Sequence, residues 1–138
     1  MPKPVYDFVD AKGHNVIAEW LEGLDKVMRA RMELKLEVLL TIDADLPPKL
    51  LTDTREPQIK ELCVNSKEAL RLLVCKGPRP EFKNNEFTLL FGAKERDRKY
   101  VPKDAPERAE RIRKLVLADP AKHRVLRKPE TNDDPKSV

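Results

Sequence analysis

The stretch QIKELCVNSKEALRLLVCK, residues 58–76, contains two apolar segments joined by a short polar turn. Residues 58–64 and 69–76 each have the length and composition of a β-strand, and the turn NSKE between them suits a tight reversal. Such a short connection predicts an antiparallel hairpin. A third strand-like segment, EFTLLFGAK (86–94), follows the proline-containing loop GPRPEFKNN. The three segments therefore predict an antiparallel meander.

Residues before the meander predict one strand and two helices. The segment VYDFVD (5–10) alternates like a strand and ends at the turn residues AKGHN. Asn15 is a suitable helix cap, and the residues that recur after it at helical spacing are Ile17, Trp20, Leu21 and Leu24. Residues 26–42 contain no Gly or Pro and predict a second helix, with Asp25 as its cap and an apolar stripe of Val27, Leu34 and Val38. We expect the two helices to pack as a hairpin.

A final helix is predicted after the meander. Asp104 is placed to cap it and Pro106 lies just inside its first turn, while Pro120 ends it. Its apolar side consists of Ala109, Ile112, Leu115 and Val116. The fold class is therefore α+β. We expect one domain, residues 1–119, in which the N-terminal strand and the meander form a small antiparallel sheet packed against the helix hairpin, with the last helix added at the C-terminus.

Residues 120–138 are predicted to be a tail without fixed structure. The segment is basic at its start and acidic later, and it contains few large apolar side chains that could offset the entropy of ordering it. His123 would act in proton transfer only if this tail folded back onto the domain.

The composition places the chain among small globular proteins. Its 138 residues suit one domain, with 40% hydrophobic and 38% charged residues. No apolar run approaches the length of a membrane span, and the first ten residues lack the pattern of a secretory signal, so we expect a cytoplasmic protein with no membrane partner. Cys63 and Cys75 are then expected to be reduced, and His14 and His123 stand too far apart in the sequence to predict a metal site.

The charge is distributed unevenly along the chain. Residues 1–70 carry a net charge of −3, whereas residues 71–138 carry +7. Clustered Lys and Arg attract polyanions, so the second half of the chain is expected to face nucleic acid.

Four segments together resemble a known family. They are YDFVDAKGHNVIAEWLEGL near the start, PPKLLTDTREPQIKEL before the second strand, ALRLLV in the central strand and LLFGAKERDRKYVPKDAPERAERI at the back. In this order they resemble the RelE/HigB-like toxins of type II toxin–antitoxin systems, within the RelE/ParE superfamily and its phage-derived branch. The resemblance implies a RelE-like fold, a cognate antitoxin protein as partner, and an endoribonuclease that cleaves mRNA on the ribosome. It also implies cleavage by 2′-OH attack without a metal or cofactor.

The candidate site residues follow from the charged positions of these segments. Arg71 lies on the strand face of Leu73 and Cys75, where alternation alone allows an apolar residue, and the resemblance gives it the role of stabilising the phosphorane. The alternative is that its stem covers the sheet and its head is solvated or paired with an acid. The other predicted catalytic residues are Lys94, Arg96 and Tyr100. The predicted RNA-binding residues are Lys60, Arg79, Arg98, Lys99, Lys103 and Arg111.

Two positions depart from the family pattern. Where related sequences often have an arginine two residues after a glutamate, this chain has Cys63 after Glu61, and where they often have a tyrosine after the central arginine, it has Val74. These departures leave two alternatives to the ribonuclease: a ParE-like inhibitor of DNA gyrase, or a catalytically inert phage-derived module that binds nucleic acid or protein.

Overall fold

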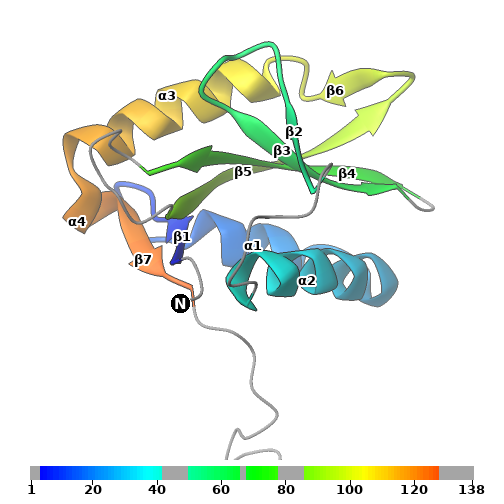
Figure 1. Ribbon diagram of the computed structural model, residues 1–138, viewed down its shortest axis with the longest axis horizontal. Helices are drawn as coiled ribbons and strands as arrows, with labels where there is room; N and C mark the ends of the chain where they lie inside the picture. Colours follow the sequence, from blue (N-terminus) through cyan, green and yellow to red (C-terminus); the bar gives the residue numbers. More distant parts are fainter. Residues whose placement is uncertain (1–3, 42–49, 66–67, 78–85, 128–138) are drawn as a thin grey trace, which may run out of the picture.

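The computed structural model describes residues 4–41, 50–65, 68–77 and 86–127. Within these ranges the chain is α+β, as expected, and forms an open mixed sheet of seven strands with four helices (Figure 1). The strands are β1 Val5–Phe8, β2 Leu51–Asp53, β3 Lys60–Asn65, β4 Ala69–Lys76, β5 Phe87–Arg96, β6 Lys99–Val101 and β7 Arg124–Leu126. The helices are α1 Val16–Glu22, α2 Lys26–Thr41, α3 Ala105–Ala118 and α4 Pro120–His123. No helix in the described ranges is long and apolar enough to cross a membrane.

The sheet contains the predicted meander but is larger than expected. Its order is β2-β3-β4-β5-β1-β7, and β6 pairs with the far end of β5. β3, β4 and β5 are antiparallel neighbours, as the short turns predict. However, β1 runs parallel to β5, with Val5 opposite Phe87, so the expectation of a purely antiparallel sheet is wrong. Two helices and three strands separate β1 from β5 along the chain, and therefore no hairpin turn sets its direction.

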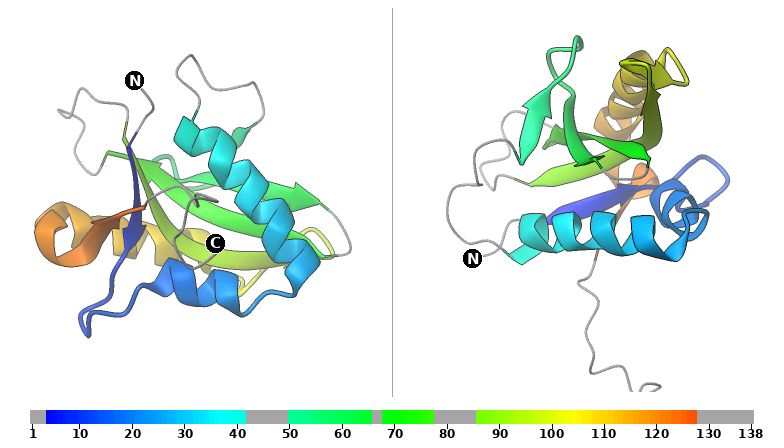
Figure 2. Two further views of the ribbon diagram at one scale, coloured as in Figure 1. Left: turned by 90° about the horizontal axis from the view of Figure 1, so that it is seen from below. Right: turned by 90° about the vertical axis from the view of Figure 1, so that its right-hand side faces the viewer.

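Helices cover both faces of the sheet. α1 and α2 lie on one face and α3 lies on the other (Figures 1 and 2). The core under α1 and α2 includes the sheet residues Leu62, Leu70, Leu72 and Val74, and the core under α3 includes Leu73, Cys75, Leu90 and Ala93. The buried apolar side chains of the central strands are therefore divided between two separate cores.

The caps and the inner side of α1 agree with the sequence, but the inner side of α2 does not. Asn15 accepts a hydrogen bond from the Ala18 N–H at 2.9 Å, and Asp25 accepts one from the Met28 N–H at 2.9 Å. Val27 and Leu34, expected to face the core, are 61% and 63% exposed. The buried stripe of α2 is instead Met28, Met32, Leu36 and Leu39. Apolar residues lie on both sides of this helix, so helical spacing alone fits two stripes, and burial selects the larger one.

The apolar side of α3 was predicted correctly except for one residue. Ala109 and Val116 are buried and Ile112 packs against the same core, whereas Leu115 is 48% exposed. Asp104 stands at the cap position, but its carboxylate accepts a hydrogen bond from Arg108 Nε at 2.9 Å and caps no backbone N–H.

The prediction of an unstructured tail is wrong for residues 120–127. α4 follows α3 directly, and β7 pairs antiparallel with β1. The Arg127 N–H donates to the Val5 carbonyl at 2.8 Å, and the buried His123 ring has Nδ1 2.9 Å from the Val9 carbonyl. These contacts join residues more than a hundred positions apart, which a local apolar pattern cannot show. Residues 128–138 lie outside the described ranges.

Candidate functional site

Arg71 lies on the α3 face of the sheet. Its cross-strand neighbours are Cys63 on β3 and Ala93 on β5, and directly opposite residues project from the same face. Ala93 packs in the core under α3 together with Leu73 and Cys75. The predicted alternation along β4 is therefore correct, and a charged side chain emerges among apolar ones.

The basic run that follows β5 divides between the two faces. Lys94 is opposite Leu70, which packs in the core under α1 and α2, so Lys94 projects on that face, and Arg96 follows it two residues later. Tyr100 is opposite Glu95 and packs against the core under α3. The structure therefore brings Tyr100 to the face of Arg71 and places Lys94 and Arg96 on the other face.

The guanidinium of Arg71 is already paired. The residue is only 7% exposed, and its Nη2 donates to Glu95 Oε2 at 2.5 Å. Its Nη1 donates to the Leu70 carbonyl at 2.9 Å. The structure therefore shows the ion pair with an acid, and the role of Arg71 toward phosphate stays a prediction.

Tyr100 forms a hydrogen-bonded pair with Glu61. The phenol donates to Glu61 Oε2 at 2.6 Å. Partial burial, the hydrogen bond to Glu61 and the negative charge of that carboxylate all raise the pKa of Tyr100. The phenol therefore keeps its proton near neutral pH and acts as a donor.

β3 contributes polar side chains that the sequence did not identify as site residues. Thr52 on β2 donates to Glu61 Oε1 at 3.3 Å and lies 3.8 Å from Cys63 Sγ. Burial, followed by the charge of Glu61, raises the pKa of the Cys63 thiol, which therefore stays protonated despite the nearby Arg71. Glu61 is two residues before Cys63 on the same strand face, and this spacing is the signal that would have joined it to Arg71.

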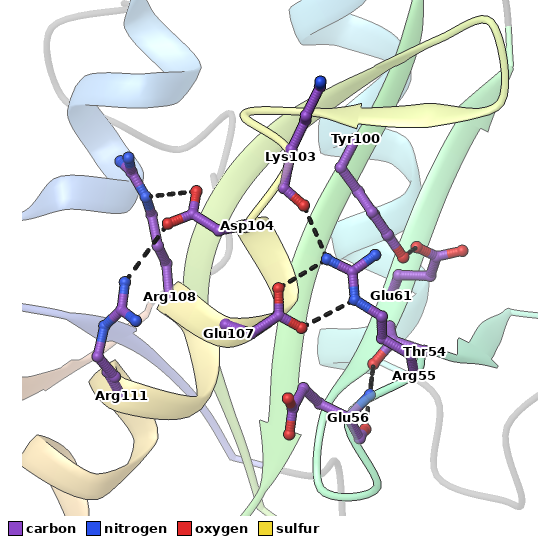
Figure 3. A network of polar contacts seen from close by, with 10 residues as sticks. All are labelled: Thr54, Arg55, Glu56, Glu61, Tyr100, Lys103, Asp104, Glu107, Arg108 and Arg111. Atoms are coloured by element: carbon purple, nitrogen blue, oxygen red, sulfur yellow. Dashed lines mark hydrogen bonds and ion pairs between the residues drawn. The ribbon is translucent and has the colours of Figure 1, made fainter.

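Arg55 ties this part of the sheet to the start of α3 (Figure 3). Its Nε donates to Glu107 Oε2 at 2.8 Å, and its Nη2 donates to Glu107 Oε1 at 2.6 Å and to the Lys103 carbonyl at 2.7 Å. The Arg55 guanidinium carbon also lies 5.5 Å from the centre of the Tyr100 ring. The hydrogen bond from Arg55 lowers the pKa of Glu107. Arg55 therefore fixes the connection between β2 and β3 beside Tyr100.

The predicted RNA-binding residues have different surroundings. Lys60 pairs with Asp53 on β2, and Arg111 is 3.5 Å from Asp104. The exposed side chains of Arg96, Arg98, Lys99 and Lys103 have no ion-pair partner within the described ranges. Arg79 lies outside the described residues.

Two of these cations lie at the turn between β5 and β6, Arg98 in the turn and Lys99 at the start of β6. Asp97 and Arg98 have φ angles of 51° and 64°, as in the tight hairpin turns that suit twisted strands. Arg98 and Lys99 are exposed there. A basic tip therefore projects beyond the end of the sheet.

Taken together, the α3 face carries the Glu61–Tyr100 pair and the Arg71–Glu95 pair, with Arg55 beside Tyr100 and exposed cations at the border. Among these groups, Glu61 and Tyr100 can transfer a proton and Arg71 can stabilise an anion. The part of the chain that the structure describes contains no group of three or more His, Cys, Asp or Glu residues that could hold a metal ion. Comparisons with protein-family models, with curated proteins and with solved structures give no match to this chain.

Proposed function

We propose that the protein is the toxin of a type II toxin–antitoxin pair and an endoribonuclease that cleaves mRNA on the ribosome. The observation that carries the proposal is the presence of Arg71 and the Glu61–Tyr100 pair on one sheet face. The resemblance of four sequence segments to RelE/HigB-like toxins supports the same function, as does the net charge of +7 in residues 71–138.

These three side chains supply the groups that cleavage by 2′-OH attack requires: a proton acceptor, a proton donor and a cation. Glu61 accepts the proton of the 2′-OH while the 2′-oxygen forms a bond to phosphorus. Arg71 stabilises the negative phosphorane that results. The bond from phosphorus to the 5′-oxygen then breaks, and Tyr100 donates its proton to that oxygen. Glu61 returns the proton it took to Tyr100 across their 2.6 Å hydrogen bond. The products are a 2′,3′-cyclic phosphate and a 5′-hydroxyl.

The exposed cations supply the attraction to RNA. Arg98 and Lys99 at the hairpin tip, together with Arg96 and Lys103, provide positive charge without a carboxylate partner among the described residues. Contacts of this kind to phosphate contribute affinity that falls as salt rises. Losing one contact to single-stranded RNA is expected to reduce the slope of log K against log salt by about 0.7.

The central test is Arg71→Ala in a translation reaction that contains ribosomes and a reporter mRNA. We expect most cleavage to be lost, as read by primer extension, while association with ribosomes is largely retained because the basic tip is unchanged. Arg71→Lys keeps the charge without the planar fork and is expected to recover only part of the activity. Arg98→Ala is the matched control and should weaken association more than cleavage at saturation. Cleavage by Arg71→Ala at the unmodified rate would refute the assigned centre.

The antitoxin is expected to cover the basic half of the chain. An acidic segment that masks both Arg71 and Lys94 must contact both sheet faces, because these side chains project in opposite directions. Hydrogen exchange of the complex should therefore slow near both residues. Protection limited to the acidic front half of the chain would show that the antitoxin does not mask the site directly.

A second candidate function uses the same fold but involves no RNA cleavage. Arg71 is occupied by Glu95, and Cys63 stands where related sequences often have an arginine, so the protein is also compatible with a ParE-like gyrase inhibitor. Expression in cells separates the functions. Translation arrest with cut transcripts supports the ribonuclease, induction of the DNA-damage response supports gyrase inhibition, and unaffected growth supports an inert binding module.

A further inference from the structure

The face that carries Arg71 is closed to anions as it stands. Glu95 and Glu61 are both on this face, so the three charged side chains have a net charge of −1. Arg71 has 7% of its surface exposed and uses one guanidinium nitrogen for Glu95 and another for a backbone carbonyl. A phosphate group approaching Arg71 would be repelled by the carboxylates on this face and would find the guanidinium already paired with Glu95.

We propose that Glu95 occupies the place of a phosphate group, and that the site beside Arg71 binds a phosphate or phosphodiester when this carboxylate moves away. The inference deepens the proposed function, because it names the regulation and the ligand class of the same arginine. A carboxylate and a phosphate both offer an arginine two oxygen acceptors in one plane, so they compete for one set of donors. Glu95 therefore keeps the site blocked until a stronger anion arrives.

The surroundings of Glu95 allow it to leave. Its side chain is 33% exposed, in contrast to the 9% of its partner Arg71, so the carboxylate can be hydrated as the pair opens. A pocket of about 130 Å³ beside it is lined by Glu68, Ala69, Lys94, Glu95 and Arg96. Lys94 in this pocket is paired with Glu68 at 3.1 Å, whereas Arg96 has no ion-pair partner among the described residues. This pocket thus gives the displaced carboxylate a place to move at the exposed end of β5.

RNA held by the basic tip has an advantage over free phosphate in this exchange. A strand bound by Arg98 and Lys99 presents its next phosphates close to the sheet, so the displacement of Glu95 becomes an intramolecular event with a high effective concentration. Free phosphate must act from bulk solution. The blocked site therefore favours RNA that is already bound over small anions.

The test measures stabilisation by inorganic phosphate in the intact chain. Thermal unfolding is followed with increasing phosphate at constant ionic strength for the unmodified protein, Glu95→Gln and Glu68→Gln. Glu95→Gln leaves Arg71 buried without its carboxylate, so we expect a lower Tm without phosphate. We also expect phosphate to bind this variant at least about tenfold more tightly than the unmodified protein, seen as a larger rise in Tm.

Glu68→Gln is the matched control for net charge. It removes the same charge from the same pocket but leaves the Arg71–Glu95 pair intact, so it should respond to phosphate like the unmodified protein. The double variant Arg71→Ala/Glu95→Gln removes both members of the pair and should lose the tighter phosphate binding expected of Glu95→Gln. Equal gains in Glu68→Gln and Glu95→Gln, a gain that persists in the double variant, or no gain in Glu95→Gln would each overturn the inference.

A second variant and a second assay keep the outcomes separate. If Glu95→Gln does not fold, Glu95→Asp takes its place, because it retains the charge but shortens the reach to Arg71. We expect it to bind phosphate more tightly than the unmodified protein, by a smaller factor than Glu95→Gln. Unchanged phosphate binding by Glu95→Asp would count against the inference. Phosphate binding as expected, together with no cleavage of mRNA on ribosomes by any variant, would refute the proposed function and support this site. Cleavage by the unmodified protein without tighter phosphate binding by Glu95→Gln would support the proposed function and refute this site.

Discussion

Replacing Arg127 by alanine tests whether the C-terminal strand holds the fold together. The guanidinium reaches Asp7 Oδ2 at 3.0 Å through Nη1 and Glu33 Oε1 at 3.3 Å through Nη2. Asp7 is 3% exposed, and without Arg127 the hydrogen bond that its carboxylate keeps within the described residues is the one from the Asn15 amide at 3.0 Å. Removing one partner of a buried ion pair costs about 3–5 kcal/mol, because the other charge stays buried. For a chain of this size we expect Tm to fall by roughly 10–17 °C.

The assay is unfolding in urea, followed by circular dichroism. Arg31→Ala is the matched control, since Arg31 is exposed on α2 and has no ion-pair partner in the described ranges, so its free energy of unfolding should change by less than about 0.5 kcal/mol. Asp7→Ala/Arg127→Ala should be more stable than Arg127→Ala alone, because the buried carboxylate of Asp7 is then no longer left without its cation.

A small effect would contradict the structure. If Arg127→Ala lowers the free energy of unfolding by less than about 1 kcal/mol, the pair with Asp7 is not formed in solution. The expectation from composition, that the chain beyond residue 119 has no fixed structure, would then be correct for β7 as well.

Three further predictions concern the core and the site. Gly92→Ala should destabilise the protein by about 1–3 kcal/mol, because a Cβ there would lie 2.0 Å from the Trp20 ring, and fluorescence of this single tryptophan should shift. The raised pKa of Tyr100 means that the folded state keeps a proton that the unfolded chain loses near pH 10, so stability should fall as pH rises above about 10, and Glu61→Gln should reduce this loss in urea unfolding at several pH values. Burial raises the pKa of Cys75 to about 12, so alkylation at pH 8 should leave Cys75 unmodified in the folded protein and modify it in urea.

The elements that the sequence predicted correctly are those with local signals. The hairpin β3–β4 follows from a short polar turn between two apolar runs, and the start of α1 follows from Asn15, whose side chain caps the helix three residues later. The residues that make up each of these signals lie close together in the sequence, and the structure forms the turn and the cap that they predict.

The elements that the sequence missed depend on contacts between distant segments. β7 has three residues, too few to show the alternation of a strand in the sequence, and Val125 and Leu126 are 45% and 50% exposed. It is held by backbone pairing with β1 and by Arg124, which lies 2.9 Å from Glu86 and 3.8 Å from the centre of the Tyr6 ring. No spacing rule joins residue 124 to residues 6 and 86.

The sequence predicted only part of the candidate site, because some of its residues come together through strand pairing and strand alternation. Arg71 was identified because a charge interrupts an apolar strand face, which is a local signal. Glu61 was not, because it was compared only with the family pattern, although its pairing with Leu73 across the predicted β3–β4 hairpin brings it to the face of Arg71. Lys94 and Arg96 were grouped with Tyr100 because they are close in sequence, although period-two alternation separates them.

This alternation gives one strand two opposite roles. Lys94 and Arg96 project on the face of α1 and α2, and Glu95, between them in sequence, projects on the face of Arg71. A substitution at Arg96 therefore changes the positive potential around the end of the sheet without breaking the Arg71 ion pair. A substitution at Glu95 changes that ion pair and leaves both neighbouring cations in place. These two residues are adjacent, so the two assays can separate their effects only if β5 is an ordered strand as far as Arg96. If a substitution at either residue changed both RNA association and phosphate binding, this end of β5 would not be ordered in solution.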